Sequence, residues 1–288
     1  MSDAEAVRYD RQIRLWGKST QQQLMHTGVA LLGVAGAAAE AAKNLALAGV
    51  QAVAVMDAGD VTDDDAATNY LMQDAVGDTR GARARGALCR LNPYVAVYDS
   101  AAKLDSVCAT RVTVAALASV KDAAPHLCGT PPLAADVVAL HITCGSTVLA
   151  LFLYSRLPEH SLAEQWRRLV ADAGLLAQRP RGFQKAVLLL HVRADAASRG
   201  FAAAAATAYA VVGRLQLQQL TATDVQEVLQ TGAHGAGVPD CVSDTVAGAC
   251  IAQHLIRQIG AVHQPPDAQS YRWMVCDCGA EVECLVGL

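Results

Sequence analysis

Residues 29–57 read VALLGVAGAAAEAAKNLALAGVQAVAVMD, and this stretch decides the fold. A short apolar run ends at the turn that begins with Gly33. A helical run follows over residues 37–48, and Gly49 is placed to cap its end. A second apolar run ends in Asp57. The pattern predicts a β-α-β unit whose first turn approximates a nucleotide-binding glycine loop.

The glycine positions of that loop are only partly kept. The pattern Gly-x-Gly-x-x-Gly is filled by Gly33, by Ala35 (or Gly36, shifted by one residue) and by Ala38. Glycine lets the backbone approach a pyrophosphate, whereas an alanine methyl group takes up space that phosphate oxygens need. The loop therefore predicts either a degenerate nucleotide pocket built on Gly33, Gly36 and Asp57, or a turn that only packs the helix on the strand.

The rest of the chain continues the alternation of strands and helices. Strands are expected at residues 94–98, 111–117, 134–142 and 147–157, and helices at residues 77–91, 118–128, 183–197, 201–220 and 243–259. Residues 271–275 and 281–285 flank a turn and predict a hairpin. The sequence predicts an α/β fold with a Rossmann-like, doubly wound, mostly parallel sheet, flanking helices and a C-terminal hairpin. One domain is expected over residues 1–288.

Three segments outside this pattern carry expectations of their own. Residues 1–6 are expected to fray, with a polar helix over residues 19–25. The acidic run at residues 58–65 is interpreted as a solvated loop in preference to a metal site. Ser161 and Glu164 have the spacing of a capping box and predict the start of a helix.

Composition excludes several classes of function. Of the 288 residues, 53% are hydrophobic and 17% charged, which allows a large core, and the net charge of −4 gives no reason to expect nucleic acid as a partner. The apolar run at residues 183–192 is too short to span a membrane. The nine cysteines are scattered and no signal peptide is evident, which favours a reducing compartment, the cytosol or the nucleus. Cys276, Cys278 and Cys284 lack a second closely spaced pair, so no metal site is expected.

Near the N-terminus, residues 9–17 read YDRQIRLWG. Arg11 and Arg14 lie three positions apart, beside Tyr9 and Trp16. They are either part of a solvated helix face or part of an arm that carries guanidinium groups into another site. Arginine suits the second role because its planar fork pairs with phosphate oxygens.

These nine residues carry a family resemblance, together with the strand-turn-helix that contains Glu40-x-x-Lys43-Asn44. The chain resembles the adenylation fold of the ThiF and ubiquitin-activating enzyme family, and within it the small regulatory subunits of SUMO-activating enzymes. The resemblance is strong over residues 7–100 and 241–288. It is faint between them, where the chain has a divergent, shortened helical segment at about residues 148–240.

The resemblance implies that this chain is the degenerate half of an adenylating pair. Active halves carry Gly-x-Gly-Gly-x-Gly, Asp-x-Asp, Asn-x-x-Arg-Gln and a lysine on the following helix. Here Asp57 remains, but Gly59 replaces the second aspartate, Met72 replaces the motif's arginine, and Arg80 stands in place of the lysine. Phosphoryl chemistry depends on positioning and on charge neutralisation, so a site without those groups is expected to be inactive alone.

The resemblance also implies a partner. The expected assembly is a heterodimer with a large catalytic subunit that binds ATP and Mg²⁺, adenylates the C-terminal glycine of a SUMO-type modifier and carries the catalytic cysteine. The expected role of this chain is that of a regulatory subunit of an ATP-dependent, ligase-type activating enzyme, with no cofactor of its own. Arg11 matches the family arginine that reaches in trans to the γ-phosphate of the partner's ATP, and Arg14 is a weaker candidate for the same surface. The expected location is the nucleus, with the cytoplasm as a second one.

Three other interpretations stay open at this point. The regulatory subunit of a neddylation-activating enzyme has a similar opening, although those subunits are much longer. A NAD-dependent oxidoreductase would use Asp57 to accept a hydrogen bond from a ribose hydroxyl, and would leave Arg11 unexplained. A binding scaffold without an ATP-linked role would make Arg11 dispensable.

Overall fold

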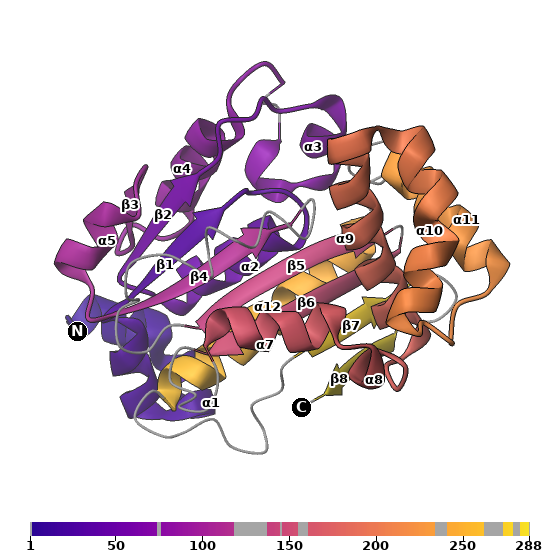
Figure 1. Cartoon of the computed structure of the whole chain (residues 1–288). Helices are drawn as coiled ribbons and strands as arrows, with labels where there is room; N and C mark the ends of the chain where they lie inside the picture. The colour runs from indigo at the N-terminus through magenta and orange to yellow at the C-terminus, as the bar shows by residue number, and fades with distance from the viewer. Residues whose placement is uncertain are drawn as a thin grey trace.

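An eight-stranded sheet is the centre of the computed structural model, which describes residues 2–73, 76–117, 137–144, 146–154, 161–233, 241–261, 273–278 and 283–287. Figure 1 shows helices on both faces of this sheet. The strand order is β3-β2-β1-β4-β5-β6-β7-β8. The strands are β1 (Thr27–Leu32), β2 (Ala52–Met56), β3 (Ala96–Tyr98), β4 (Thr110–Ala116), β5 (Val137–Cys144), β6 (Thr147–Tyr154), β7 (Trp273–Asp277) and β8 (Glu283–Gly287).

Strands β3, β2, β1, β4 and β5 pair in parallel, and β6, β7 and β8 add antiparallel pairs. The predicted α/β class with a mostly parallel sheet is confirmed, and the predicted hairpin is β7 with β8. β6 runs antiparallel to β5 because only two residues separate Cys144 from Thr147. A parallel connection would need a crossover of about a dozen residues or more.

The helices alternate with strands in the first half of the chain and then follow one another. They are α1 (Asp3–Leu24), α2 (Ala37–Ala48), α3 (Asp63–Thr68), the 3₁₀ turn η1 (Tyr70–Met72), α4 (Arg80–Leu91), α5 (Ala102–Val107), α7 (Leu162–Ala171), α8 (Ala173–Leu176), α9 (Arg181–Arg199), α10 (Phe201–Leu215), α11 (Ala222–Ala233) and α12 (Cys241–Gly260). The predicted β-α-β unit is β1, α2 and β2, and α2 has the predicted bounds. Gly49 follows α2 at φ 85°, in the left-handed conformation that a glycine cap adopts.

The strands bury both faces of the sheet. In β6, Phe152 belongs to the core formed with α2 and α12, while its neighbour Leu153 belongs to the core formed with α7 to α11. Helix α12 lies closely on α2, because a Cβ added to Gly248 would be 2.6 Å from the carbonyl oxygen of Ala37. α2 and α12 therefore form one closely packed layer on one face of the sheet.

Helix α1 is attached to the C-terminal ends of these two helices. Gln21 Nε2 donates to the carbonyl of Ala48 at 2.8 Å, and a Cβ added to Gly260 at the end of α12 would lie 2.7 Å from Thr20 Oγ1. Tyr9 is buried in the same contact. Gly17, at φ 89°, kinks α1 between Tyr9 and Thr20. The N-terminal arm is thus held on the layer formed by α2 and α12.

Within the described residues, the prediction that residues 1–6 fray is wrong, because Ser2 caps α1 and the helix begins at Asp3. Ser2 and Glu5 form a reciprocal capping box there, in which each side chain accepts the other residue's backbone N–H. This pair satisfies N–H groups that the first turn of a helix leaves open.

The interpretation of residues 58–65 as a loop is wrong at its C-terminal end, where α3 begins at Asp63. Thr62 and Asp65 cap this helix in the same reciprocal way. Carboxylates in the first turn also suit the positive end of the helix dipole. The acidic run is therefore partly a helix start.

Other element ends differ from the predictions by a few residues. α4 begins at Arg80, later than predicted, and α10 ends at Leu215 because Gln216 adopts a left-handed φ of 53°. The Ser161 hydroxyl accepts a backbone N–H and caps α7 as predicted. The helix predicted at residues 118–128 lies outside the described residues. Among the described helices, none has both the length and the apolar character needed to cross a bilayer.

Candidate functional site

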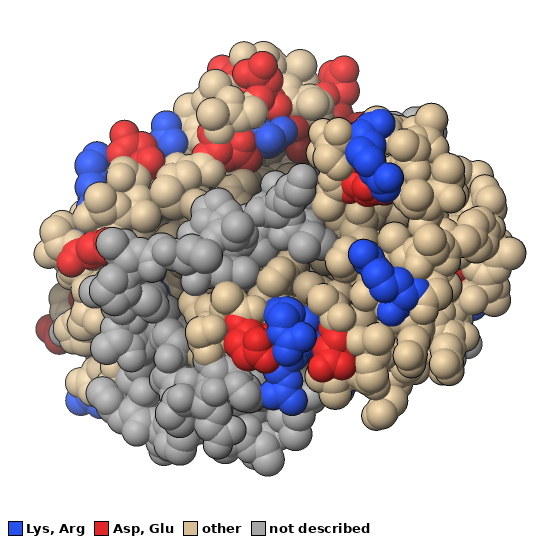
Figure 2. Space-filling view, viewed as in Figure 1, with Lys and Arg blue, Asp and Glu red and all other residues tan. Residues whose placement is uncertain are grey.

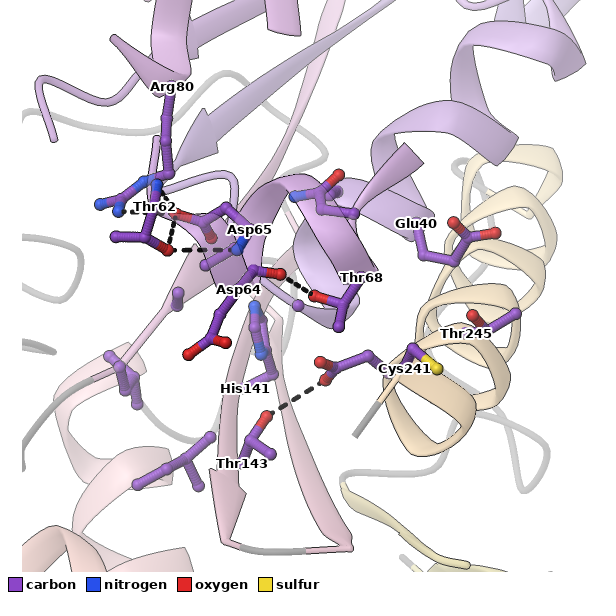
Figure 3. Close-up of a pocket in the computed structure, with 18 of the residues that line it drawn as sticks. Glu40, Thr62, Asp64, Asp65, Thr68, Arg80, His141, Thr143, Cys241 and Thr245 are labelled. Carbon is purple, nitrogen blue, oxygen red and sulfur yellow. Dashed lines mark hydrogen bonds and ion pairs between the residues drawn. The ribbon is translucent and has the colours of Figure 1, made fainter. Parts of the chain in front are cut away.

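A cavity of about 400 Å³ opens at the carboxyl end of the parallel strands (Figure 3). Its wall includes Gly36 and Glu40 from the glycine turn and α2, residues of α3, the ends of β4 and β5, and the first residues of α12. Open α/β sheets bind ligands at this edge, where the loops leave the strands. The cavity is therefore the candidate functional site.

A carboxylate of the chain itself closes the glycine turn. Gly33, at φ 83°, donates to the carbonyl of Met56 at 3.0 Å, and Gly36, at φ 54°, is the N-cap of α2. A Cβ added to Gly36 would lie 2.8 Å from Asp244 Oδ1, and the Thr143 hydroxyl donates to this same oxygen at 3.3 Å. A helix N-terminus attracts anions, and a phosphate bound at such a turn lies close to it. Here the carboxylate of Asp244 is at that end of α2.

Asp57 is held by the protein and faces away from solvent, with a side chain that is 6% exposed. Arg80 donates to it through Nε at 3.0 Å and Nη2 at 3.2 Å. The backbone N–H groups of Val34 and Gly59 each donate to it at 2.9 Å. Burial opposes ionisation, but the Arg80 guanidinium and these N–H groups outweigh it and hold the pKa of Asp57 below its usual value. Asp57 therefore fixes the glycine turn to α4.

The same contacts hold the guanidinium of Arg80 against Asp57. Its hydrogen bonds to Asp57 raise the pKa of its guanidinium, and Nη1 lies 3.5 Å from Asp65 Oδ2. Nη1 also donates to the carbonyl of Asp60 at 3.2 Å. A phosphate that approached Arg80 would compete with these partners. Arg80, which stands in place of the family's lysine, is thus bound by other residues of this chain.

Negative groups outnumber positive ones in the described wall of the cavity. Its charged residues are Glu40, Asp64, Asp65 and Asp244 against Arg80 and Arg193. Figure 2 shows acidic side chains gathered at the top of the molecule, where the segment around α3 lies. An excess of negative charge in a pocket wall opposes the approach of an anion. Among the residues that the structure describes, no group of three His, Cys, Asp or Glu side chains is arranged to hold a metal ion.

His141, near the end of β5, contributes an unusual polar group to the wall. Its side chain is buried, with the residue 4% exposed, and neither ring nitrogen has a hydrogen-bond partner among the described residues. Burial lowers its pKa to about 4, so the ring is neutral at physiological pH. A buried polar group without a partner costs about 1–3 kcal/mol. Figure 3 shows the ring between Asp64 and Thr143.

The two predicted arginines lie at the other end of α2. Arg11 is exposed on α1, and Arg14 forms an exposed ion pair with Asp10 at 3.0 Å. α1 contacts the C-terminal end of α2, whereas the cavity lies at the N-terminal end of this 12-residue helix, about 18 Å away. The structure therefore brings Gly33, Gly36 and Asp57 together around the glycine turn and keeps Arg11 and Arg14 apart from them.

Sequence reasoning missed His141, Thr143 and Asp244. No motif marks them: His141 is a single histidine in an apolar strand, and Asp244 is a polar residue in the first turn of a helix. The acidic run that includes Asp64 and the capping pair Thr62 and Asp65 were the available signals for α3. They are consistent with a helix start, although the run was interpreted as a loop, and they do not indicate which cavity the helix faces.

Comparison with known proteins agrees with this geometry. Residues 9–123 match the ThiF family. This match covers less than half of the chain. The matched residues include β1, α2, β2, α4 and β4, and so the glycine turn and Asp57. The predicted family resemblance is confirmed over this part of the chain.

Curated relatives and solved structures extend the comparison. The chain is 41% identical to SUMO-activating enzyme subunit 1 of Xenopus laevis and 42% identical to that of Homo sapiens, in each case over 98 residues. Each match covers 34% of this chain and 28% of the relative, so the chain aligns with under a third of the relative's length. The fold is similar to E. coli MccB solved with AMPCPP and MccA, with a TM-score of 0.61 at 12% identity over 97% of this chain and 70% of MccB. A structure of PaaA gives a TM-score of 0.58 at 13% identity, covering 99% of this chain and 83% of PaaA.

Proposed function

We propose that this chain is the regulatory subunit of a SUMO-activating enzyme and donates Arg11 in trans to a nucleotide site on its partner. The partner is a large catalytic subunit that binds ATP and Mg²⁺ and adenylates the C-terminal glycine of a SUMO-type modifier. The match to the ThiF family and the similarity to subunit 1 sequences support this assignment. The placement of Arg11 is the observation that carries it.

Arg11 lies too far from the cavity of its own chain to complete it. Val7 and Leu15 lie four residues to either side of Arg11 on α1, so the three side chains share one face of the helix. Val7 is 80% exposed and Leu15 is 75% exposed. An exposed arginine flanked by exposed apolar side chains is suited to contact with another protein. This arrangement supports the delivery of Arg11 to a partner.

The chemistry of the cavity supports a non-catalytic role. Arg80 is committed to Asp57, Met72 replaces the arginine of the family motif and is buried, and Asp244 lies at the N-terminus of α2. Adenylation requires cations that neutralise developing phosphate charge, so these substitutions favour an inactive half. The predicted use of Gly33, Gly36 and Asp57 as a degenerate nucleotide pocket stays a prediction, which direct titration with Mg-ATP would test.

The test is pyrophosphate exchange by the chain reconstituted with candidate large subunits. Arg11→Ala should leave the heterodimer intact by size-exclusion chromatography and slow exchange on the order of 10³-fold, the lower end of what an arginine finger contributes. Lys18→Ala is the matched control, because Lys18 is an exposed cation on the same helix beyond the Gly17 kink. Exchange that is equally fast in both variants would show that Arg11 has no role at the partner's ATP.

The choice of partner separates two versions of this proposal. Pull-down with the large subunits of SUMO-activating and neddylation-activating enzymes decides between them. The oxidoreductase interpretation has less support, because the carboxylate of Asp57 already accepts two hydrogen bonds from Arg80 and two from backbone N–H groups.

A further inference from the structure

Outside the cavity, a groove lies beside helix α4, and Figure 1 shows this helix near β2 and β3 at one edge of the sheet. The α4 groove, as we call it, has a volume of about 220 Å³ and shares no described lining residue with the cavity. Its wall includes Tyr70 and Gln73, from η1 and just after it, and Arg83, Arg90 and Leu91 from α4. Among its described lining residues, two are cations and none is a carboxylate. The charge of this wall is therefore opposite to that of the cavity.

The two arginines of the α4 groove are available to an outside anion. Arg83 and Arg90 are seven positions apart, so they share one face of α4 and lie about 10 Å apart along its axis. Arg83 Nη2 donates to the carbonyl of Gln73 at 2.6 Å, which is a neutral acceptor, and Arg90 is exposed. Within the part of the chain that the structure describes, neither guanidinium has a carboxylate partner. They differ in this from Arg80, on the same helix, which Asp57 binds.

Tyr70 gives the α4 groove an exposed aromatic edge. The residue is 49% exposed, and Nζ of Lys43, which also pairs with Glu40, lies 5.4 Å from the centroid of its ring. Tyrosine and arginine are enriched at protein interfaces and among the residues that contribute most to binding. The volume of the groove is also below the roughly 300–1,000 Å³ of small-molecule pockets. These features favour contact with side chains of another protein over a small ligand.

The basic surface continues from the α4 groove onto α1. Arg8 is exposed, and its Nη2 donates to the carbonyl of Leu91 at 2.8 Å, so a third guanidinium lies at the Leu91 end of the groove. Its hydrogen-bond acceptor is neutral, as is that of Arg83. A linear anion with several charges could therefore contact cations on both helices.

We propose that the α4 groove binds an extended acidic peptide segment of another protein. Two carboxylates of the segment accept hydrogen bonds from Arg83 and Arg90, whose planar forks suit carboxylates. An extended peptide rises about 3.4 Å per residue, so carboxylates three positions apart match the roughly 10 Å between the two arginines along α4. The ring of Tyr70 packs on the aliphatic part of the segment's side chains. This site does not involve Arg11 and is tested on the chain alone.

The experiment measures the fluorescence anisotropy of labelled hexaglutamate as the full chain is added, with hexaglutamine as the uncharged comparison. Arg83→Gln and Arg90→Gln should each weaken hexaglutamate binding about fivefold, the upper end of what one exposed ion pair contributes. Lys103→Gln is the matched control for net charge. Lys103 is an exposed cation of α5, whose Leu104 packs on the face of the sheet opposite to Leu88 of α4. Its replacement should change the affinity less than about twofold.

A further variant tests the groove without a change in charge. Tyr70→Ser removes the aromatic edge, so it should also weaken hexaglutamate binding, while thermal unfolding shows that each variant is folded. Equal losses of affinity in Lys103→Gln and Arg90→Gln would show nonspecific attraction between charges and overturn the proposal. It would also be overturned if hexaglutamate did not bind at millimolar concentration, if hexaglutamine bound as tightly, or if Tyr70→Ser had no effect. None of these results depends on whether Arg11 acts in trans.

Discussion

Arg80→Gln tests whether the cation at the glycine turn is structural. The guanidinium donates to Asp57 at 3.0 and 3.2 Å, and the Asp57 side chain is 6% exposed. Removing one partner of a buried ion pair costs about 3–5 kcal/mol. The cost should be lower here, because two backbone N–H groups still serve Asp57 and the Arg80 side chain is 26% exposed. We therefore expect a loss of about 2–3 kcal/mol in the free energy of unfolding.

Urea unfolding at pH 7 measures this loss. Arg90→Gln is the control, because Arg90 is an exposed cation near the C-terminal end of the same helix, and its removal should cost less than about 1 kcal/mol. The slope of free energy against urea concentration should be unchanged in both variants, since neither alters the surface exposed on unfolding.

The pH dependence gives a second readout. The folded-state pKa of Asp57 is lowered, so its ionised form stabilises the fold above the unfolded-state pKa of about 3.9. That contribution is lost as the pH falls through the folded-state pKa. The difference between the wild type and Arg80→Gln should thus be constant near neutral pH and narrow in acid, as Asp57 takes a proton. The reasoning would be refuted if Arg80→Gln lost no more free energy of unfolding than Arg90→Gln. It would also be refuted if the difference in free energy of unfolding between the wild type and Arg80→Gln stayed constant down to pH 3.

Three further predictions follow from burial and backbone geometry. Gly49→Ala should destabilise the protein by at least about 1 kcal/mol, because Gly49 has φ 85° and an added Cβ would lie 2.6 Å from the Tyr9 ring. Gly86→Ala, in α4, should be neutral or stabilising, and thermal unfolding of both variants checks the contrast. Burial raises the pKa of the Cys144 thiol to about 11, so Cys144 should react with a thiol reagent only on unfolding, whereas exposed Cys89 should react in the folded protein; peptide mapping that finds both labelled at equal rates would contradict this. The pKa of His141 is about 4 in the folded protein against about 6.5 in the unfolded chain. As the pH drops from 6.5 to 4, the free energy of unfolding should therefore fall by about 1.4 kcal/mol per pH unit. Urea unfolding should show a weaker pH dependence of the free energy of unfolding in His141→Gln.

The elements that sequence reasoning located well are those with local causes. The apolar run of β1, the bounds of α2 and the left-handed cap at Gly49 all depend on residues within a few positions of one another. The start of α3 was located less well, although it also has a local cause. The capping pair at the start of α3 was present in the sequence, but the acidic composition of residues 58–65 favoured a loop interpretation.

Only part of the candidate site could be predicted from the sequence. Gly36 and Asp57 belong to a recognisable motif, so their meeting at the glycine turn follows from the β-α-β pattern. Asp244 reaches Gly36 from α12, more than 200 residues later in the chain. His141 comes from β5, whose place beside β4 depends on the strand order. Neither position carries a local signal that would point to the cavity.

The sequence by itself determined the β-α-β core, because hydrophobic period, glycine placement and capping act over a few residues. Only the tertiary structure decided that Arg80 is bound to Asp57, that Asp244 lies at the N-terminus of α2, and that Arg11 is at the far end of that helix. The reason is physical: the charge and hydrogen-bonding state of a side chain depends on its neighbours, and here the fold brings those neighbours from distant segments.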